Sequence, residues 1–407
     1  MGGPIDVAFC FDDHLALPGA VTLLSLAKTN PGVRIHVMAD PGTRCRPLVE
    51  AVAAAHGATV QVLEQAPEAA ELLNPHGAYG GYSTATYRRL FLPRLLPDLD
   101  RVLYLDSDMI VRGDLRALWE TELGGAAIAA VPDAWATTVA PMRDRFPQGY
   151  FNSGTLVMDL AEWRRRGVAR ACLDYLASAP PDPYQFWDQT PLNEVLRGGW
   201  HRVSPRWNFM TLYSPQLADQ LGIAADDYAE IAADPAIVHF LAAYKPWISG
   251  FERLGRFYAE WHAVRQELVA RFDTAGLDWP GSYINSRQAA MERRMMALRL
   301  VVGARARGFE RPTVLLTGLL GHEVALVARE QGYAINGFAS EYSAVHGGQL
   351  LDLPVLGIDQ ALDQGARTFI IGDYRRLDRT RATLAHAAAA RDIAIRTIDP
   401  GGGRLAA

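Results

Sequence analysis

The stretch of sequence that decides the fold is Val102-Leu103-Tyr104-Leu105-Asp106-Ser107-Asp108-Met109-Ile110-Val111. A short apolar run predicts a buried strand, and a second apolar run follows the two carboxylates. Carboxylates at the end of a core strand need a partner, because burying an unpaired charge is very costly. A divalent cation held against a diphosphate would be that partner, since Mg²⁺ and Mn²⁺ bind oxygen ligands. In the structural alternative Asp106 caps a turn and Asp108 is solvated.

The composition limits the class of protein. The chain has 407 residues, enough for two or three domains, and a net charge of -5, which is not the basic footprint of nucleic-acid binding. No secretory signal precedes the expected first strand, and no apolar stretch approaches the ~18 residues needed to span a bilayer. Three scattered cysteines predict neither a zinc site nor a disulfide framework but a reducing cytoplasm: Cys10, Cys45 and Cys172.

Residues 1–250 carry the pattern of a catalytic α/β domain, in which short apolar runs alternate with helical patterns. The spacing suits a doubly wound sheet, whose ligands lie beyond the carboxyl ends of the strands. Strands are expected at residues 5–11, 33–38, 59–63, 102–105, 126–131 and 153–158, and helices at 17–29 and 46–56.

Residues 251–310 form an Arg-rich extension. Met291, Met295, Leu298 and Val302 make an apolar stripe at helical spacing, flanked by arginines. Residues 284–308 could therefore lie on the inner face of an anionic membrane as a peripheral contact. The alternative is a linker helix that packs on the catalytic domain and leaves its arginines in solvent.

Residues 311–407 predict a small Rossmann-like α/β domain. Strands are expected at 313–316, 335–339, 355–356 and 368–371, with helices to residue 331 and over 380–391. The turn after the first strand reads Gly318-x-x-Gly321, not the full dinucleotide fingerprint, and no acidic residue closes the expected second strand. We therefore expect no nicotinamide cofactor here, although a nucleotide- or NAD-binding module centred on this domain is an alternative function.

Further polar residues stand where strand ends are expected. Asp12 and Asp13 follow the first strand, where a nucleotide base and ribose commonly bind, or Asp13 caps the next helix. Arg88 and Arg89 lie on different helix faces, so one guanidinium is expected to reach the site and the other to be solvated.

The second half of the catalytic domain adds sugar- and phosphate-binding residue types. Asn152 offers a donor and an acceptor for sugar hydroxyls, and Asp188 with Gln189 beside aromatic residues suits a sugar as well as a helix cap. His239 ends an apolar run, as a third metal ligand or as a satisfied core residue, and Lys245 could neutralise a diphosphate.

The order of these motifs resembles the family 8 glycosyltransferases, retaining enzymes of the GT-A fold that include bacterial galactosyl- and glucosyltransferases. The resemblance covers about residues 5–250, and the C-terminal domain is an addition to it. The motifs that carry it are Asp12-Asp13, Thr86-Tyr87-Arg88-Arg89-Leu90, Leu103-Tyr104-Leu105-Asp106-Ser107-Asp108, Tyr150-Phe151-Asn152-Ser153-Gly154, Trp187-Asp188-Gln189 and His239 with Lys245-Pro246-Trp247, and Trp207-Asn208-Phe209 is similar to another family segment.

The resemblance implies a mixed GT-A sheet and a UDP-sugar donor held through Mn²⁺ or Mg²⁺. Asp106, Asp108 and His239 would bind the metal, and Gln189 and Asp188 would be the catalytic residues. The chain departs from the family pattern at Ala242, where relatives carry the glycine that meets the diphosphate, and at Gly81, where some carry a histidine. The implied donor-binding residues are Asp12, Asp13, Arg89, Asp106, Ser107, Asn152, Ser153, Asp188, Gln189, Ala242 and Lys245.

The implied reaction moves a hexose, glucose or galactose by family default, to a hydroxyl of a glycan, a lipid-linked glycan or a small molecule. Gln189 stands where a nucleophile would be expected, and a neutral amide is a poor one. Front-face attack is therefore favoured, with Asp188 as the fallback nucleophile. A sugar nucleotidyltransferase is the nearest alternative, but it would open with a Gly-rich basic loop where this chain has Asp12-Asp13-His14.

Overall fold

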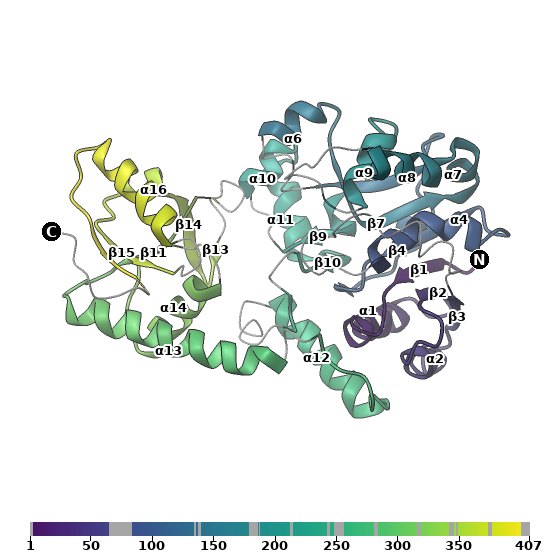
Figure 1. Cartoon of the computed structure of the whole chain (residues 1–407), viewed down its shortest axis with the longest axis horizontal. Coiled ribbons are helices and arrows are strands. Elements are labelled where there is room, and N and C mark those ends of the chain that lie inside the picture. The colour runs from purple at the N-terminus through teal and green to yellow at the C-terminus, as the bar shows by residue number, and fades with distance from the viewer. Residues whose placement is uncertain are drawn as a thin grey trace. The chain divides into compact units, whose positions relative to one another are not determined.

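The chain divides into two units in the computed structural model (Figure 1). The first unit holds Met1–Thr211, Ile223–Trp247 and Phe257–Gly281, and the second holds Leu212–Gly222, Ile248–Arg256 and Ser282–Ala407. The domain boundaries expected at residues 250 and 310 stay a prediction. The structure describes residues 3–64, 84–133, 136, 140–178, 186, 188–211, 215–241, 245–247, 256–280, 284–315, 319–341, 346, 349–372 and 377–399.

A mixed sheet forms the body of the first unit, as expected from the sequence. Its parallel part follows the strand spacing, but β7 runs antiparallel to both β4 and β6, a reversal that the spacing did not specify. The order of the sheet is β3 (Thr59–Glu64), β2 (Arg34–Ala39), β1 (Asp6–Cys10), β4 (Arg101–Leu105), β7 (Phe151–Asp159), β6 (Ile128–Pro132) and β8 (His201–Arg202).

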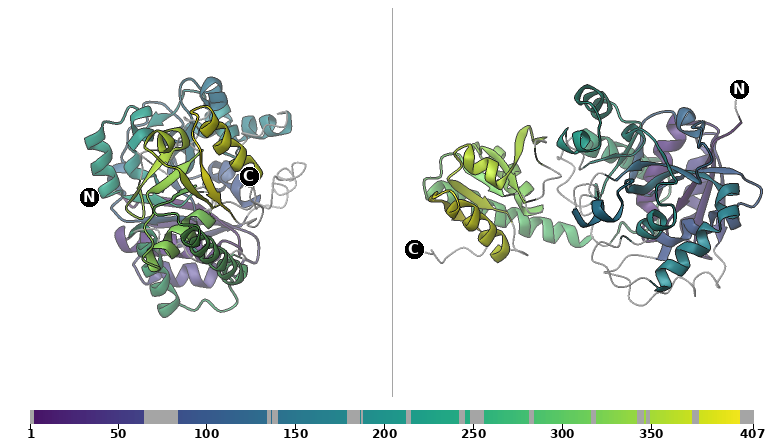
Figure 2. Two further views of the ribbon diagram at one scale, coloured as in Figure 1. Left: turned by 90° about the vertical axis from the view of Figure 1, so that its left-hand side faces the viewer. Right: turned by 90° about the horizontal axis from the view of Figure 1, so that it is seen from above.

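Alternating side chains bury both faces of this sheet. Val102 and Tyr104 of β4 belong to the core beneath α7 (Leu160–Arg166), α8 (Val168–Ser178) and α9 (Gln189–Val195), while Leu103 points the other way and is also buried. On that other side lie α1 (Ala16–Thr29) and α2 (Arg46–Ala54), as Figures 1 and 2 show. The part of this unit that the structure describes also contains the helices η2 (Thr84–Phe91), α4 (Leu92–Leu95), α5 (Arg116–Trp119), α6 (Ala140–Arg145), η4 (Pro205–Trp207), α11 (Ala225–Ala233) and most of α12 (Arg256–Arg271).

A second, three-stranded sheet brings distant segments to the end of β4. Its middle strand, β10 (Ile237–His239), pairs antiparallel with β5 (Met109–Val111) and parallel with β9 (Phe209–Met210). The register sets His239 opposite Met109. Because β5 begins directly after Asp108, this pairing carries the histidine to the Asp-x-Asp turn.

The second unit contains its own sheet, and the expected C-terminal α/β domain is present. The strands are parallel except for β13, which runs antiparallel to β14. The order is β13 (Gln349–Leu350), β14 (Leu353–Gly357), β12 (Gly337–Ser340), β11 (Thr313–Leu315), β15 (Thr368–Ile371) and β16 (Arg396–Ile398). In chain order, the five parallel strands read 3-2-1-4-5, which is the doubly wound Rossmann arrangement.

Helices cover both faces of this sheet. Val314 belongs to the core with α13 (Ile284–Ala306) and α14 (Leu319–Glu330), and its neighbour Leu315 to the core with α15 (Ile358–Asp363) and α16 (Leu377–Ala389). The short helix α10 (Pro215–Gln220) is also assigned to this unit. The second strand ends one residue later than expected, at Ser340, so that Glu341 directly follows it.

The Arg-rich helix α13 does not bury the stripe expected from the sequence. Its buried residues include Leu300 and Val301, whereas Met295 is 51% exposed and Val302 is 55% exposed. The side chain of Met291 lies outside the described set. Within the described residues, none of the helices combines the length and apolar character that crossing a bilayer requires.

Candidate active site

The Asp-x-Asp turn joins the two sheets of the first unit. Asp106 comes directly after β4, Asp108 directly before β5, and Ser107 lies between them with 6% of its surface exposed. Helix α1 fixes this turn, because the Thr22 hydroxyl lies 2.9 Å from the carbonyl oxygens of both Ser107 and Met109 and donates its hydrogen between them. The two carboxylates therefore project from a turn whose backbone is held in place.

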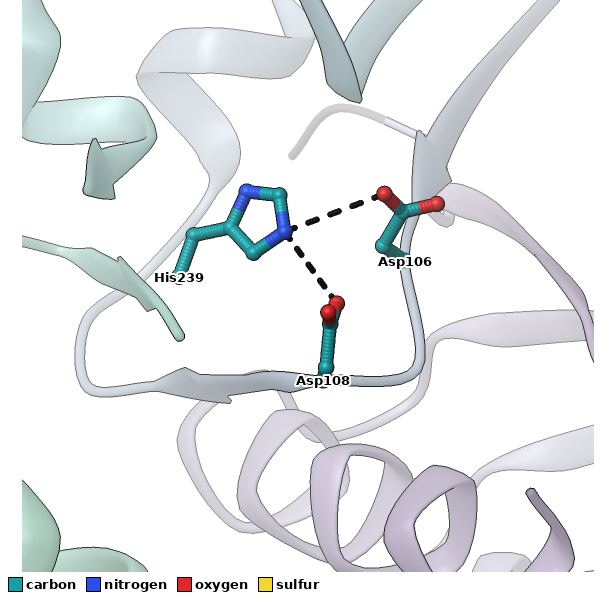
Figure 3. A group of neighbouring side chains, drawn as sticks. All are labelled: Asp106, Asp108 and His239. Atoms are coloured by element: carbon teal, nitrogen blue, oxygen red, sulfur yellow. Dashed lines mark ion pairs between the residues drawn. The ribbon is translucent and has the colours of Figure 1, made fainter. Parts of the chain in front are cut away.

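His239 completes a group of three ligand atoms (Figure 3). Its Nε2 lies 3.2 Å from Oδ1 of Asp108 and 3.8 Å from Oδ2 of Asp106. All three ligand atoms lie within 4.8 Å of one another. A cation with ligands at ~2.1 Å separates neighbouring ligand atoms by about 3 Å, close to this spacing. The Asp108 Oδ1 atom is buried and has no hydrogen-bond partner among the described residues, so the group fits a divalent cation.

Gly154 makes room for this arrangement. A Cβ atom there would lie 2.4 Å from Cε1 of His239 and 2.9 Å from Oδ2 of Asp106. The backbone of Gly154 also accepts a hydrogen bond from the Asp106 N–H at 2.8 Å. The glycine is thus required by the close approach of β7 to two metal-type ligands.

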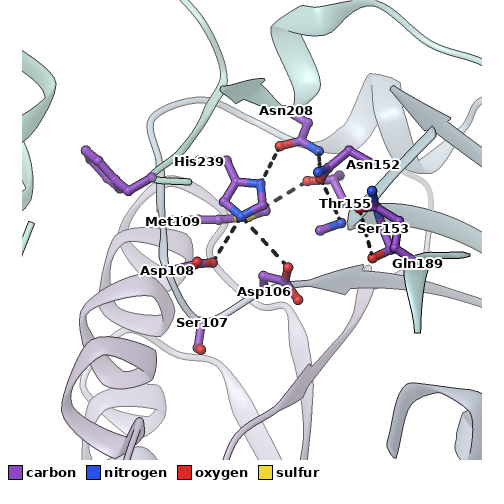
Figure 4. A network of polar contacts seen from close by, with 12 residues as sticks. Asp106, Ser107, Asp108, Met109, Asn152, Ser153, Thr155, Gln189, Asn208 and His239 are labelled. Carbon is purple, nitrogen blue, oxygen red and sulfur yellow. Dashed lines mark hydrogen bonds and ion pairs between the residues drawn. The ribbon is translucent and has the colours of Figure 1, made fainter. Parts of the chain in front are cut away.

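Asn208 sets the tautomer of His239 (Figure 4). The Asn208 side-chain oxygen lies 2.9 Å from His239 Nδ1, and its amide nitrogen donates to Asn152 Oδ1 at 2.8 Å. Since the amide oxygen only accepts, Nδ1 carries the hydrogen and the Nε2 lone pair faces the carboxylates. This protonation pattern is the one that a metal-binding imidazole needs.

Lys245 pairs with the second carboxylate. Its ammonium donates to Oδ2 of Asp108 and to the Phe240 carbonyl oxygen, the latter at 2.7 Å. Burial would raise the pKa of the Asp108 carboxyl, but the ammonium group of Lys245 outweighs burial and holds this pKa far below its usual value. Asp108 is therefore ionised at any pH at which the protein would work.

Arg89 is buried between two carboxylates. It donates to Asp106 Oδ1 at 2.9 Å, and its Nε lies 3.0 Å from Asp188 Oδ2. The Tyr104 hydroxyl also donates to Asp106 Oδ1, at 2.8 Å, which leaves Oδ2 to face His239. Burial raises the pKa of the Asp188 carboxyl to about 6, against the lowering effect of Arg89.

Gln189 is held at both ends of its amide. Its Nε2 donates to Oδ2 of Asp133 at 3.1 Å, and its Oε1 accepts the N–H of Ser153 at 3.0 Å. Asn152 donates to the same Asp133 oxygen at 3.0 Å. A continuous chain of contacts therefore runs from His239 to Gln189 through Asn208, Asn152 and Asp133 (Figure 4 labels all of these except Asp133).

The Asp12-Asp13 loop has structural partners of its own. Asp12 Oδ1 accepts the N–H groups of His14 at 3.0 Å and Leu15 at 3.2 Å, so this residue, and not Asp13, holds the entry to α1. Asp13 Oδ1 accepts from the Thr43 hydroxyl at 2.6 Å and from the Arg44 N–H at 3.0 Å. Asp13 thereby ties the loop after β1 to the loop after β2. The expected role of both residues in nucleotide binding stays a prediction.

Arg88 and Arg89 point in different directions, as expected, but both are buried. Arg89 reaches the site, whereas Arg88 pairs with Asp40 and is only 2% exposed, so the expectation of a solvated guanidinium was wrong. The reason is that residues 88–91 of η2 are all buried, in a helix that packs between β1, α4 and α8. Gly81, Trp187 and Ala242 lie outside the described residues.

Sequence reasoning missed the roles of Asp133 and Asn208. Asp133 follows β6, so the strand-end rule that found Asp106 could have found it. Asn208 belongs to the Trp207-Asn208-Phe209 motif, but the local sequence pattern does not show which side chain Asn208 contacts. Both are buried, with 6% and 0% of their surfaces exposed.

The fold and this acidic, histidine-bearing cluster define a glycosyltransferase, and the comparisons name the family. The model of glycosyl transferase family 8 matches residues 6–250, so the chain belongs to that family, and its first unit has the GT-A fold. The matched segment excludes the sheet of the second unit.

Individual relatives agree with this assignment. General stress protein A of Bacillus subtilis (strain 168) is 28% identical over 281 residues, 65% of this chain and 96% of that protein. Lipopolysaccharide 1,2-glucosyltransferase of Escherichia coli (strain K12) is 30% identical over 177 residues, 41% of this chain and 50% of that relative. The crystal structure of galactosyltransferase LgtC with donor and acceptor sugar analogs matches with 25% identity and a TM-score of 0.57, covering 68% of this chain and all of that one.

Proposed function

We propose that the protein is a metal-dependent, retaining hexosyltransferase that moves glucose or galactose from a UDP-sugar to a hydroxyl acceptor. The observation that carries the proposal is the group of Asp106, Asp108 and His239 with Lys245 beside it. The relatives support the sugars, since one is named as a glucosyltransferase and another as a galactosyltransferase. The acceptor is a glycan, a lipid-linked glycan or a small molecule.

The charges of the site suit departure of a diphosphate. A divalent cation, Mn²⁺ or Mg²⁺, held by Asp106, Asp108 and His239 would supply Lewis-acid stabilisation of the leaving UDP. Lys245, on the Asp108 carboxylate, places a further positive charge beside the same phosphates. Arg89 offsets the charges of Asp106 and Asp188, so the donor sugar meets a site that is not strongly anionic.

The polar contacts favour front-face attack over a covalent intermediate. Gln189 is a neutral amide with its oxygen already bonded to Ser153, so it orients the donor and does not attack it. Asp188, the fallback nucleophile, is 3% exposed and paired with Arg89. In the front-face step the acceptor oxygen bonds to the anomeric carbon as the sugar–phosphate bond breaks, and the acceptor proton passes to the leaving phosphate oxygen.

The alternatives rest on fewer observations. A sugar nucleotidyltransferase would need basic groups after β1, where Asp12 and Asp13 instead bind the backbone. The peripheral membrane contact through 284–308 stays a prediction, as does a cytoplasmic location. Exposed Met295 and Val302 favour the membrane contact, while Arg294 pairs with Glu323 and Glu330 and so offers less free charge.

A donor panel with product analysis tests this proposal. The protein with Mn²⁺ is incubated with UDP-glucose, UDP-galactose, ADP-glucose and GDP-mannose over an acceptor panel that includes water. We expect UDP-sugars to be consumed and the product to retain its anomeric configuration in proton NMR coupling constants. Gln189→Ala should be slow but still retaining. An inverted wild-type product, or preference for a non-UDP donor, would contradict the proposal.

A further inference from the structure

The second unit has the geometry of a ligand site that lies outside the glycosyltransferase segment. Its strand order places β11 between β12 and β15. After β11 the chain adds β12 and β14 on one side of it, then crosses over and adds β15 and β16 on the other side. In open α/β sheets of this kind, ligands bind beyond the carboxyl ends of the strands at that reversal point. The described residues near these strand ends are Gly321, Glu341 and Gly372.

Two glycines bring these segments into close contact. A Cβ atom at Gly372, just after β15, would lie 2.3 Å from the Cα atom of Gly321 in the first turn of α14. The N–H of Gly372 donates to the Leu315 carbonyl oxygen at 3.3 Å. In the spacing Gly318-x-x-Gly321, Gly321 thus does what the last glycine of a nucleotide-binding turn does, allowing close packing of helix on strand.

Glu341 lies at the position that commonly binds a ribose. It directly follows β12, the second strand of the unit, where an acidic side chain accepts hydrogen bonds from ribose hydroxyls in this fold. Its Oε1 atom is buried and has no hydrogen-bond partner among the residues that the structure describes. Leaving a buried carboxylate oxygen unpaired is costly, and a ligand hydroxyl would remove that cost.

Arg379 approaches Glu341 from the other side of β11. It belongs to the first turn of α16, the helix that follows β15, and its Nε lies 3.8 Å from Glu341 Oε2. This distance is too long for a hydrogen bond, and the Arg379 side chain is 71% exposed. The guanidinium therefore remains able to bind a phosphate next to the carboxylate.

We propose that the second unit binds a ribonucleotide at the carboxyl ends of β11 and β12. Glu341 accepts hydrogen bonds from the ribose hydroxyls, and Arg379 contacts a phosphate. An ordinary surface ion pair would explain the proximity of the two side chains, but it would leave the buried Oε1 atom without a hydrogen-bond partner among the described residues. Every residue assigned to the donor belongs to the first unit, whereas Glu341 and Arg379 belong to the second.

Calorimetry on the full-length protein in EDTA tests the site, since EDTA removes metal-dependent donor binding. UDP, UDP-glucose, ATP and NAD⁺ are titrated, each mononucleotide beside its 2′,3′-dideoxy analogue. We expect at least one ribonucleotide to bind, its dideoxy analogue to bind ~10-fold more weakly, and Glu341→Gln to abolish this difference. Arg379→Gln should weaken binding of the nucleotide but not binding of the parent nucleoside, which has no phosphate.

An exposed ion pair of the same unit supplies matched controls. Arg329 and Asp352 lie 3.3 Å apart at its surface, so Arg329→Gln and Asp352→Asn remove the same charges elsewhere and should leave affinity unchanged. Preferential NAD⁺ binding that depends on Glu341 would support the site and identify a dinucleotide ligand. The proposal is overturned if no ribonucleotide binds in EDTA, or if neither Glu341→Gln nor Arg379→Gln alters binding relative to these controls.

Discussion

The two units place an acidic residue at the same kind of position, directly after a strand, yet prepare it differently. Asp106 follows β4, and one of its oxygens is bonded to both Arg89 and Tyr104, which turns the other toward His239. Glu341 follows β12 with one oxygen unpaired among the described residues. The first carboxylate is oriented by the protein before any ligand arrives, whereas in the proposed site the free oxygen of the second would be paired by the ligand. Catalysis requires side chains that are already oriented when the substrate binds, whereas a site that only binds a ligand does not need its carboxylate to be oriented beforehand.

The largest effect is expected from removing a carboxylate charge of the Asp106-Ser107-Asp108 turn. Asp106→Asn and Asp108→Asn should each lower kcat/KM by on the order of 10³-fold, because the cation loses an anionic ligand beside the leaving diphosphate. EDTA should reduce wild-type transfer to a similar level. Circular dichroism and thermal unfolding should show an intact fold, and near wild-type transfer by either variant would remove these residues from the metal site.

Filling the space at Gly154 should be nearly as damaging to metal binding. Gly154→Ala places a methyl group 2.4 Å from His239 Cε1, so the imidazole must move away from the carboxylates. We expect Mn²⁺ affinity, followed by electron paramagnetic resonance, to fall ~10²-fold, and unfolding free energy to fall by ~1–3 kcal/mol. Gly113→Ala is the control, because its Cβ would meet Ala236 at an ordinary 3.4 Å. Equal Mn²⁺ affinity in the two variants would contradict the assignment of His239.

A smaller loss is expected when the support of His239 is removed. Asn208→Ala frees the Nδ1 hydrogen, so the imidazole is no longer fixed in its metal-binding tautomer. Mn²⁺ should bind ~10-fold more weakly. Asn30→Ala removes another buried asparagine, one whose side chain bonds to the backbone of Leu115 and of Gly113, and it should destabilise the fold without changing the Mn²⁺ affinity. If both variants bind Mn²⁺ as the wild type does, Asn208 does not orient the ligand.

The smallest expected effect is a pH dependence of stability. Burial raises the pKa of Asp188 from 3.8 to about 6, so the folded state keeps a proton that the unfolded chain releases. The wild type should therefore lose stability relative to Asp188→Asn as the pH rises from about 4 to 6, with no further change above pH 7. Thermal unfolding at a series of pH values measures this, with Asp352→Asn, an exposed carboxylate, as control. A difference in Tm that is constant across that range would contradict the raised pKa.

Much of the first site could be predicted from the sequence, because it follows strands. Asp106 follows β4, Asn152 lies at the start of β7, and His239 ends β10. Because β7 is antiparallel to β4, its start lies at the same edge of the sheet as the end of β4. The side-chain network was not predictable in the same way. Asp133 and Asn208 act through partners that are far away in the chain, and no local period records such pairs.

The second site shows how sensitive this reasoning is to a boundary. The expected second strand ended at residue 339, which left no acidic residue at its end, whereas β12 ends at Ser340 and is followed by Glu341. A shift of one residue thus reversed the conclusion about ribose binding. Backbone hydrogen bonds, which define the end of a strand, are set by its neighbours and not by its own composition.

The pairing of β5 with β10 has a thermodynamic consequence. It brings His239 to carboxylates that lie more than a hundred positions earlier in the chain. A cation bound by all three residues would therefore cross-link the two ends of a very long loop. The unfolded chain has no preformed cluster, and the free energy of cation binding therefore becomes free energy of folding. The melting temperature of the first unit should then rise with the concentration of free Mn²⁺. The ion would in that case stabilise the fold as well as take part in the reaction.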